Sequence, residues 1–229
     1  MLNTAKEVIE ACDKDNIHIY DLVLQGETKA LKMTEEEMKN KIREILDVMK
    51  GSSQETLEKS FETEYKMIDG FAKMMNDYQK DKDPLTSKFL VRAMAMAFST
   101  SETNANMGTI AAAPTAGSSG IMPAALMAAK EKYGLDDEVL INGLLTSIGI
   151  GQIIGKYATF AGAEGGCQAE CGSASAMAAA ALVEMLGGSP EEALQAASIT
   201  LINVMGLACD PIAGLVEYPC TFRNASGVM

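Results

Sequence analysis

Two cysteines, Cys167 and Cys171, stand four residues apart in a glycine-rich run that covers residues 162–173. Glycine allows the backbone to approach a bulky group closely and to adopt a positive φ where one is needed. A small-residue helix is predicted directly afterwards, over residues 174–186, and the free N–H groups at its start favour thiolate over thiol. Thiolates placed in this way act as nucleophiles, metal ligands or redox pairs.

Two more cysteines, Cys209 and Cys220, lie in a second loop that Pro211 and Pro219 prevent from becoming helical. A structural zinc site usually has ligand pairs two to four residues apart, and this pair does not match that spacing. A redox pair prefers Cys-x-x-Cys, and the first pair has one residue too many. An iron–sulfur cluster accepts ligands from separate loops. The remaining alternative is that these cysteines are simply buried as small apolar side chains. The spacing alone supports this alternative and a metal site about equally.

A Gly/Ser loop, residues 113–120, reads Ala-Pro-Thr-Ala-Gly-Ser-Ser-Gly and leads into a predicted helix with Pro123 near its start. Its N–H groups and hydroxyls could bind an anion, although an ordinary loop before a helix has the same composition. The loop lacks the spacing and the lysine of a P-loop, so it gives little support to nucleotide binding.

The composition predicts the scaffold that must position these loops. Hydrophobic residues make up 48% of the 229 residues and aromatic residues only 5%, so Ala, Gly and Met fill the interior. Such a composition indicates closely packed helices, and we expect an all-α fold in a single domain, residues 1–229, with Ala/Gly-rich inner helices. Because 33 of the 50 charged residues lie within the first 90 positions, residues 1–83 are expected to form outer polar helices and residues 84–229 the motif-bearing core.

Local signals place several of these helices. Thr34 and Glu37 form a capping box before a helix that should end at residues 51–53, and a second helix is predicted within residues 56–78. A loop over residues 79–84 and a helix over residues 85–98 follow. Asp136 caps a helix through residue 139, and Ser189 followed by Pro190 starts a helix that runs to about residue 205.

Charge and hydropathy exclude several classes of function. The net charge of −12 disfavours a nucleic-acid partner, because phosphate contacts need clustered Lys and Arg. The first residues contain no apolar segment typical of a signal peptide. The longest apolar run, residues 139–154, is interrupted by polar residues and short for a membrane span, so we expect a buried helix and no membrane partner. Five cysteines without a signal peptide indicate a cytoplasmic protein that uses metal or redox chemistry.

Three motifs resemble the alpha chain of the iron–sulfur-dependent bacterial L-serine dehydratases. They are residues 113–120, residues 162–172 and residues 206–220, the last followed by Arg223-Asn224-Ala225. The resemblance runs from about residue 85 to the end and more loosely through the N-terminal helices. It implies the catalytic alpha subunit of an L-serine ammonia-lyase, which converts L-serine to pyruvate and ammonia in amino-acid catabolism and gluconeogenesis, without pyridoxal phosphate.

The resemblance also implies the site residues. A 4Fe–4S cluster would be held by Cys167, Cys209 and Cys220, whereas Cys171 would not be a ligand and Cys12 would be buried packing. The Gly/Ser loop becomes the candidate site for the substrate carboxylate. The residues expected to bind substrate are Thr115, Gly117, Ser118, Ser119 and Asn104.

The general base is not identified by the sequence. His18, the only histidine, lies far from the motifs and is more often structural in such surroundings. Glu164 and Glu170 are candidates within the motif. In the two-chain members of the family a beta chain supplies further active-site groups, so we expect the base from a partner chain; a homo-oligomer is an additional expectation.

The sequence departs from the family pattern at two places, and two alternative functions remain. Residues 60–66 replace a segment that is usually glycine-rich in the family, and the family continues for several helices beyond the position of Met229. We therefore expect this chain alone to have little activity. The alternatives are a related lyase of the L-cysteine desulfidase type, and an inactive interaction subunit that binds a cluster or zinc.

Overall fold

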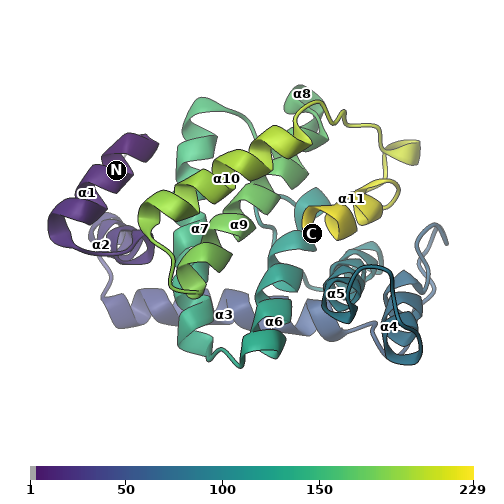
Figure 1. The fold of residues 1–229 in the computed structure, drawn as a ribbon. Helices are drawn as coiled ribbons and strands as arrows, with labels where there is room; N and C mark the ends of the chain where they lie inside the picture. Colours follow the sequence, from purple (N-terminus) through teal and green to yellow (C-terminus); the bar gives the residue numbers. More distant parts are fainter. Residues whose placement is uncertain (1–3) are drawn as a thin grey trace.

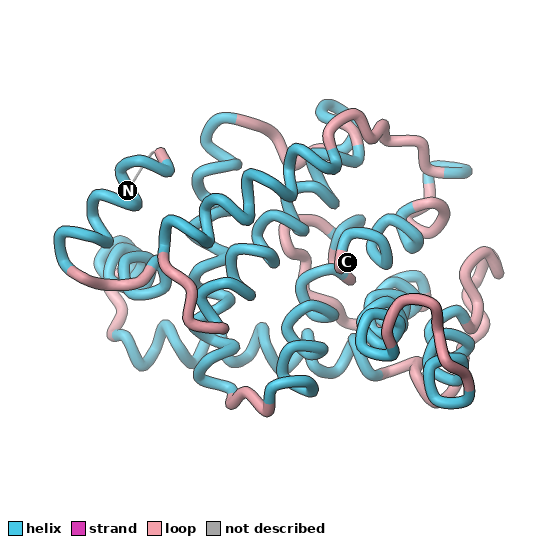
Figure 2. Tube along the Cα trace, viewed as in Figure 1, coloured by secondary structure: helices cyan, strands magenta, loops and turns pink. Residues whose placement is uncertain are grey.

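The structure, a computed structural model, describes residues 4–229. Across these residues the chain forms α-helices and no strand, which confirms the all-α fold expected from the sequence (Figures 1 and 2). The helices are α1 (Ala5–Asp15), α2 (Ile19–Leu31), α3 (Glu35–Gln54), α4 (Phe71–Asp81), α5 (Lys88–Ala105), α6 (Ile121–Tyr133), α7 (Asp137–Tyr157), α8 (Gly162–Gly165), α9 (Ser173–Met185), α10 (Pro190–Val204) and α11 (Cys220–Gly227). Two 3-10 turns, η1 (Ala116–Ser118) and η3 (Ile212–Gly214), and one π-turn, η2 (Gln168–Gly172), lie between them.

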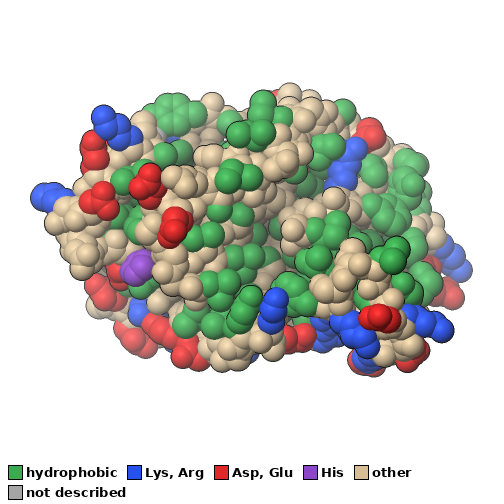
Figure 3. Space-filling view, in the orientation of Figure 1, with side chains coloured by type: hydrophobic (Ala, Val, Ile, Leu, Met, Phe, Trp, Pro, Cys, Tyr) green, Lys and Arg blue, Asp and Glu red, His purple; other side chains and the backbone are tan. Residues whose placement is uncertain are grey.

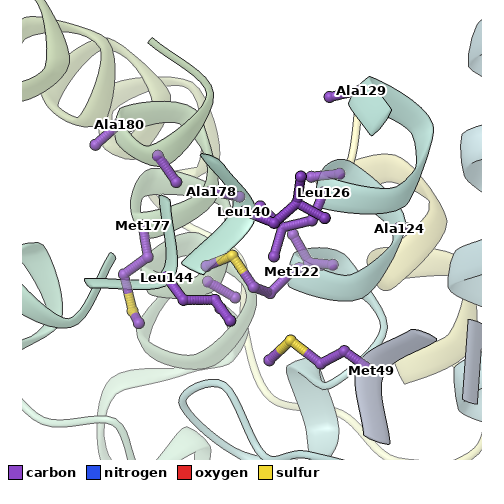
Figure 4. Close-up of a cluster of buried hydrophobic side chains, with 14 of the residues drawn as sticks. Met49, Met122, Ala124, Leu126, Ala129, Leu140, Leu144, Met177, Ala178 and Ala180 are labelled. Carbon is purple, nitrogen blue, oxygen red and sulfur yellow. The ribbon is translucent and has the colours of Figure 1, made fainter. Parts of the chain in front are cut away.

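Helix α9 is the inner helix of the molecule, and α6, α7 and α10 pack against it. Most of its buried residues are alanine or serine, so the neighbouring helices can approach its backbone closely. Larger side chains from the surrounding helices fill the remaining space, as Figure 4 shows. The buried side chains labelled there include Met49 of α3, Met122 and Leu126 of α6, Leu140 and Leu144 of α7, and Met177 of α9.

Helix α7 is, among the described residues, the one helix long and apolar enough to cross a membrane by length and composition. In this structure it packs against α9 and α2, and half of its most apolar stretch is buried. Its contact with α2 requires glycine at position 149, because a Cβ there would lie 2.8 Å from Val23 Cγ2 and 3.0 Å from Ile19 Cγ2. The apolar run is thus a core helix within this fold.

An aromatic cluster joins the C-terminal helix to the outer pair α4 and α5. The ring of Phe222 in α11 lies 5.3 Å from that of Phe71 in α4 and 5.9 Å from that of Phe98 in α5. Tyr218 packs edge-on against Phe222 at 5.0 Å. Aromatic pairs at these separations stabilise the contact beyond their buried area, so α11 is fixed to the core just after Cys220.

The helix starts predicted at Thr34, Asp136 and Ser189 are confirmed. The helix predicted within residues 56–78 is found only from Phe71, as α4, and the helix predicted over residues 85–98 continues to Ala105 as α5. Thr34, Asp136 and Ser189 each accept a hydrogen bond from the backbone N–H three residues later. Helix α3, however, continues through residues 51–53 to Gln54, and residues 55–70 are not helical. Ser52 is buried and its carbonyl accepts a hydrogen bond from Ser99 Oγ at 2.8 Å, so contacts with α5 override weak local helix propensity.

A carboxylate at the start of α7 links three helices. Asp137 accepts hydrogen bonds from Lys130 Nζ of α6 at 2.6 Å and from Lys50 Nζ of α3 at 2.7 Å. These bonds lower the pKa of Asp137 to about 2. A carboxyl group whose pKa is depressed on folding stabilises the protein above its unfolded pKa, and this contribution is lost as the pH falls through the folded pKa.

We predict that Asp137→Asn lowers the free energy of unfolding at pH 7 by about 1 kcal/mol or less, because the ion pairs are partly exposed. The difference from the original protein should shrink as the pH falls from about 4 to about 2. Urea unfolding at a series of pH values measures it. Asp136→Asn is the matched control, since it keeps an N-cap residue and removes no ion pair, and a pH-independent difference for Asp137→Asn would contradict the linkage.

Candidate functional site

The side chain of Asn224 ties the Gly/Ser loop to the C-terminal helix. Its Nδ2 donates to the carbonyls of Gly117 at 2.7 Å and Cys220 at 2.8 Å. Its Oδ1 accepts from the N–H of Gly120 at 2.8 Å. The side chain is buried, so these bonds have no competition from water. Segments about 100 residues apart in sequence therefore meet at one carboxamide.

A second joint connects the Cys167 loop to the loop that carries Cys209. Gln168 N donates to Leu207 O at 3.2 Å, and Gly206 N donates to Gln168 Oε1 at 2.7 Å. Gly166 has a φ of +80°, and a Cβ there would lie 2.5 Å from Leu207 O. Only glycine combines this backbone conformation with so close an approach.

The π-turn η2 carries Glu170 and Cys171 against the Gly/Ser loop. Thr115 Oγ1 donates to Glu170 Oε1 at 2.8 Å, and Cys171 Sγ lies 3.8 Å from Gly117 O. The π-turn continues into α9 without a break, because Gly172 has helical φ and ψ. The sequence-based expectation of a free helix start facing the thiols is therefore wrong for Cys171, which lies inside the helical segment. π-turns occur frequently at functional sites.

The four loop cysteines form one electrostatic cluster. A hydrogen bond from Cys171, helped by Arg223, lowers the pKa of Cys167 to about 6. The same bond, together with burial, strongly raises the pKa of Cys171. Burial and the negative charge of Cys167 raise the pKa of Cys220 to about 11, and the pKa of Cys209 is also raised, chiefly by desolvation. The surroundings thus favour negative charge on Cys167 and a proton on each of the other three cysteines.

Arg223 anchors the exposed Cys209 loop beside Cys167. Its Nη1 donates to Ala208 O at 2.7 Å, and its Nη2 donates to Asp210 Oδ1 at 2.6 Å. The same guanidinium also reaches the Cys167 thiolate. Sequence analysis identified Arg223 only as part of a motif; the signal for its role was the opposite charge of Asp210 in an otherwise nearly uncharged stretch.

The arrangement does not resemble a site for one metal ion. Within residues 4–229, no three His, Cys, Asp or Glu side chains are grouped closely enough to hold a single ion. Three cavities of about 340–410 Å³ lie away from the cysteines, against α3 and α5, between α2 and α7, and against α3 and α6. The cysteines instead lie around a surface site at which Cys209 is exposed and Cys167 and Cys171 are buried.

The residues expected to bind substrate are only partly brought together. Ser118 and Ser119 are buried, and their hydroxyls bond within their own turn, Ser119 Oγ donating to Ala116 O at 2.8 Å. Thr115 faces Glu170, as described above. Asn104 lies half-buried in the last turn of α5, and no hydrogen bond found in residues 4–229 joins its side chain to the loop. The assignment of these residues to substrate stays a prediction.

His18 lies outside the cysteine cluster. It precedes α2, its Nδ1 is 3.4 Å from Glu184 Oε1, and its ring stacks on Tyr20 at 4.9 Å. Glu184 is near the end of α9, about 16 Å along the helix from the start that adjoins Cys171. The only histidine therefore packs where α2 meets the far end of α9.

We predict that Asn224→Ala lowers the free energy of unfolding by about 1–3 kcal/mol, because it leaves the buried Gly120 N–H without a partner and leaves the Gly117 carbonyl only the long contact with Cys171 Sγ. Urea unfolding measures the change. Asn203→Ala is the matched control: Asn203 is exposed on α10 and bonds only to Ile199 O, so its replacement should change stability by about 0.5 kcal/mol or less. Equal effects of the two substitutions would show that Asn224 is not a structural tie.

Comparison with known proteins agrees with this geometry. The family model described as serine dehydratase alpha chain matches residues 14–229. An L-serine dehydratase, alpha chain, from Peptoniphilus asaccharolyticus is 67% identical over 229 residues, which cover all of this chain and 78% of that protein. An L-serine dehydratase from Mycobacterium bovis is 37% identical over 233 residues, covering 97% of this chain and 49% of that protein. The chain belongs to the serine dehydratase alpha chain family.

Proposed function

We propose that this chain is the catalytic alpha subunit of an L-serine dehydratase and converts L-serine to pyruvate and ammonia with a partner chain. The observation that carries the proposal is the meeting of the Gly/Ser loop, the Cys167 loop and the Cys209–Cys220 loop around Glu170 and Asn224. An amino-acid elimination needs an anion-binding loop next to a group that activates the hydroxyl, and these three segments can supply both.

We assign Cys167, Cys209 and Cys220 as the ligands of a 4Fe–4S cluster. The donor set supports this assignment, because three thiols from two loops influence one another's pKa and the pKa of Cys167 is lowered to about 6. Thiolate sulfur is the usual ligand of iron–sulfur clusters. Cys171 is the weakest candidate, since its pKa is strongly raised and its thiol lies against Gly117 O.

A cluster held by three thiolates supplies one open iron, a Lewis acid that makes a hydroxyl a better leaving group. The residues of this chain bind and orient the amino acid. The Gly/Ser loop before α6, with Thr115, Gly117, Ser118 and Ser119, would hold the substrate carboxylate near the start of that helix. Loss of the α-proton and of water gives an aminoacrylate, which hydrolyses to pyruvate and ammonia.

The general base is assigned to the partner chain. The described part of this chain places its only histidine against Glu184, and Glu164 accepts a hydrogen bond from Thr159 Oγ1 at 3.0 Å. The site is also open: Cys209 is exposed, and apolar side chains of α10 and of the segment that follows it are exposed as well, including Ile202, Met205 and Ile212. Figure 3 shows few charged side chains in the middle of the visible face, where Figure 1 places α10. A beta chain that covers this surface would supply the base, in the reducing cytoplasm where free thiols persist.

We predict that Cys167→Ser, Cys209→Ser and Cys220→Ser each lose most of their iron and sulfide after anaerobic reconstitution, because three ligands leave no spare. Cys171→Ser should retain both. Iron and sulfide per chain and the visible absorbance of the cluster measure this. Cys12→Ser, a buried cysteine of the core, is the control for damage to folding. If Cys171→Ser loses iron as completely as Cys167→Ser, a closed four-thiolate site replaces the proposed one.

We also predict that the reconstituted chain alone releases little pyruvate from L-serine, and that adding its beta chain restores turnover. The reason is that, among the described residues, none beside the cysteine cluster is assigned as the general base. Pyruvate release, compared with sulfide release from L-cysteine, measures both activity and substrate preference. Robust pyruvate release by the isolated chain would place the base within this chain.

A further inference from the structure

Glu170 occupies the junction of the site segments. Its Oε1 accepts a hydrogen bond from Thr115 Oγ1 at 2.8 Å. A Cβ at Gly162 would lie 2.3 Å from its Oε2, and a Cβ at Gly117 would lie 3.1 Å from its Oε1. The carboxylate therefore lies close to the backbone of Gly162 in α8 and of Gly117 in the Gly/Ser loop, where a side chain on either residue would crowd it. The charged group of Glu170 is therefore held at a defined position, unlike that of a flexible side chain on the surface.

The negative charge of Glu170 has no cationic partner among residues 4–229. The ion pairs of these residues do not include Glu170, and the nearby guanidinium of Arg223 pairs with Asp210 at 2.6 Å. Among these residues, the only side-chain hydrogen bond that Glu170 accepts comes from the neutral hydroxyl of Thr115. A half-buried carboxylate without a charged partner is unfavourable, and a cation bound beside it removes that cost.

We infer that Glu170 binds the α-ammonium group of the amino-acid substrate. The inference rests on the proposed function, since the ammonium group is the cation that this reaction itself brings to the site. Serine carries its ammonium and carboxylate on one carbon, so the groups that bind them must be neighbours. The hydrogen bond between Thr115 and Glu170 makes the Gly/Ser loop and this carboxylate neighbours.

Glu170 also lies close to the cysteines. The group that binds the ammonium of serine must likewise be a neighbour of the group that activates the serine hydroxyl. A Cβ at Gly162 would lie 2.3 Å from Glu170 Oε2 and 3.2 Å from Cys209 Sγ, so the carboxylate and the thiol lie within a few ångströms of one point. The ammonium and hydroxyl of serine are on adjacent carbons. Glu170 thus lies between the loop proposed for the carboxylate and a thiol proposed to hold the group that activates the hydroxyl, and it selects amino acids over hydroxy acids.

Glu170→Gln in the reconstituted enzyme with its beta chain tests this role, because the amide keeps the shape and can still accept from Thr115 Oγ1. We expect KM for L-serine to rise about 10- to 100-fold, the effect of losing a hydrogen bond to a charged group. The inhibition constant of 3-hydroxypropanoate, which keeps the hydroxyl and carboxylate but has no ammonium group, should stay within about threefold. Iron content should not change. Glu170→Asp, which keeps the charge, should recover part of the affinity for serine.

Glu164→Gln is the matched control, an exposed acid of the same motif whose side chain accepts from Thr159 Oγ1; its KM should equal that of the original protein. An unchanged KM in Glu170→Gln overturns the inference. Equal weakening of serine and 3-hydroxypropanoate also overturns it, because Glu170 would then only position the Gly/Ser loop. If the original enzyme with its beta chain neither binds nor turns over L-serine, the proposed function itself fails, and that result is visible before any variant is compared.

Discussion

The hydrogen bonds of one buried carboxamide are the constraint on which the site depends. Asn224 pairs with the buried N–H of Gly120 and the buried carbonyl of Gly117, both distant in sequence, and with the part-buried carbonyl of Cys220 in its own helix. Buried backbone groups left unpaired are costly, so this pairing selects one arrangement of the loops. The aromatic packing of Phe222 on Phe71 and Phe98 then holds the helix that carries Asn224. Stability and site geometry therefore rest on the same contacts.

Glycine and alanine make the close approaches that this constraint requires. Gly166 admits the carbonyl of Leu207, and Gly117 and Gly162 admit the carboxylate of Glu170. Behind them, the alanines of α9 allow three helices to pack on one inner helix. The low content of aromatic residues and the high content of small residues follow from this close packing, since larger side chains at these positions would separate the segments.

Features governed by neighbours in sequence could be predicted, and features governed by distant contacts could not. The helix starts at Thr34, Asp136 and Ser189 depend on side chains that bond three residues ahead, so the local pattern is sufficient. The continuation of α3 past residue 51 depends on α5, and no local signal indicates it.

The same distinction holds within the site. The cysteine motifs were visible from residue type and spacing, and the resemblance to a family assigned their roles. The π-turn that carries Cys171, the link from Arg223 to Asp210 and the three bonds of Asn224 arise only when the loops meet. From the sequence, Glu170 is only a candidate base, because the residues that contact its carboxylate come from distant segments and cannot be identified before the loops are placed.

The charge state of the cysteines shows why such a site is poised for a ligand. Cys171 and Arg223 lower the pKa of Cys167, whereas burial, together with neighbouring negative charges, raises the pKa of Cys209 and Cys220 and favours protons on these two. A metal-containing ligand needs thiolates, so binding must release those protons and supply positive charge in their place. Only one of the three proposed ligands is prepared by the protein alone, and the other two become ligands through the group they bind. The folded chain thus fixes the positions of the sulfur atoms while leaving their charge to be completed by the bound group.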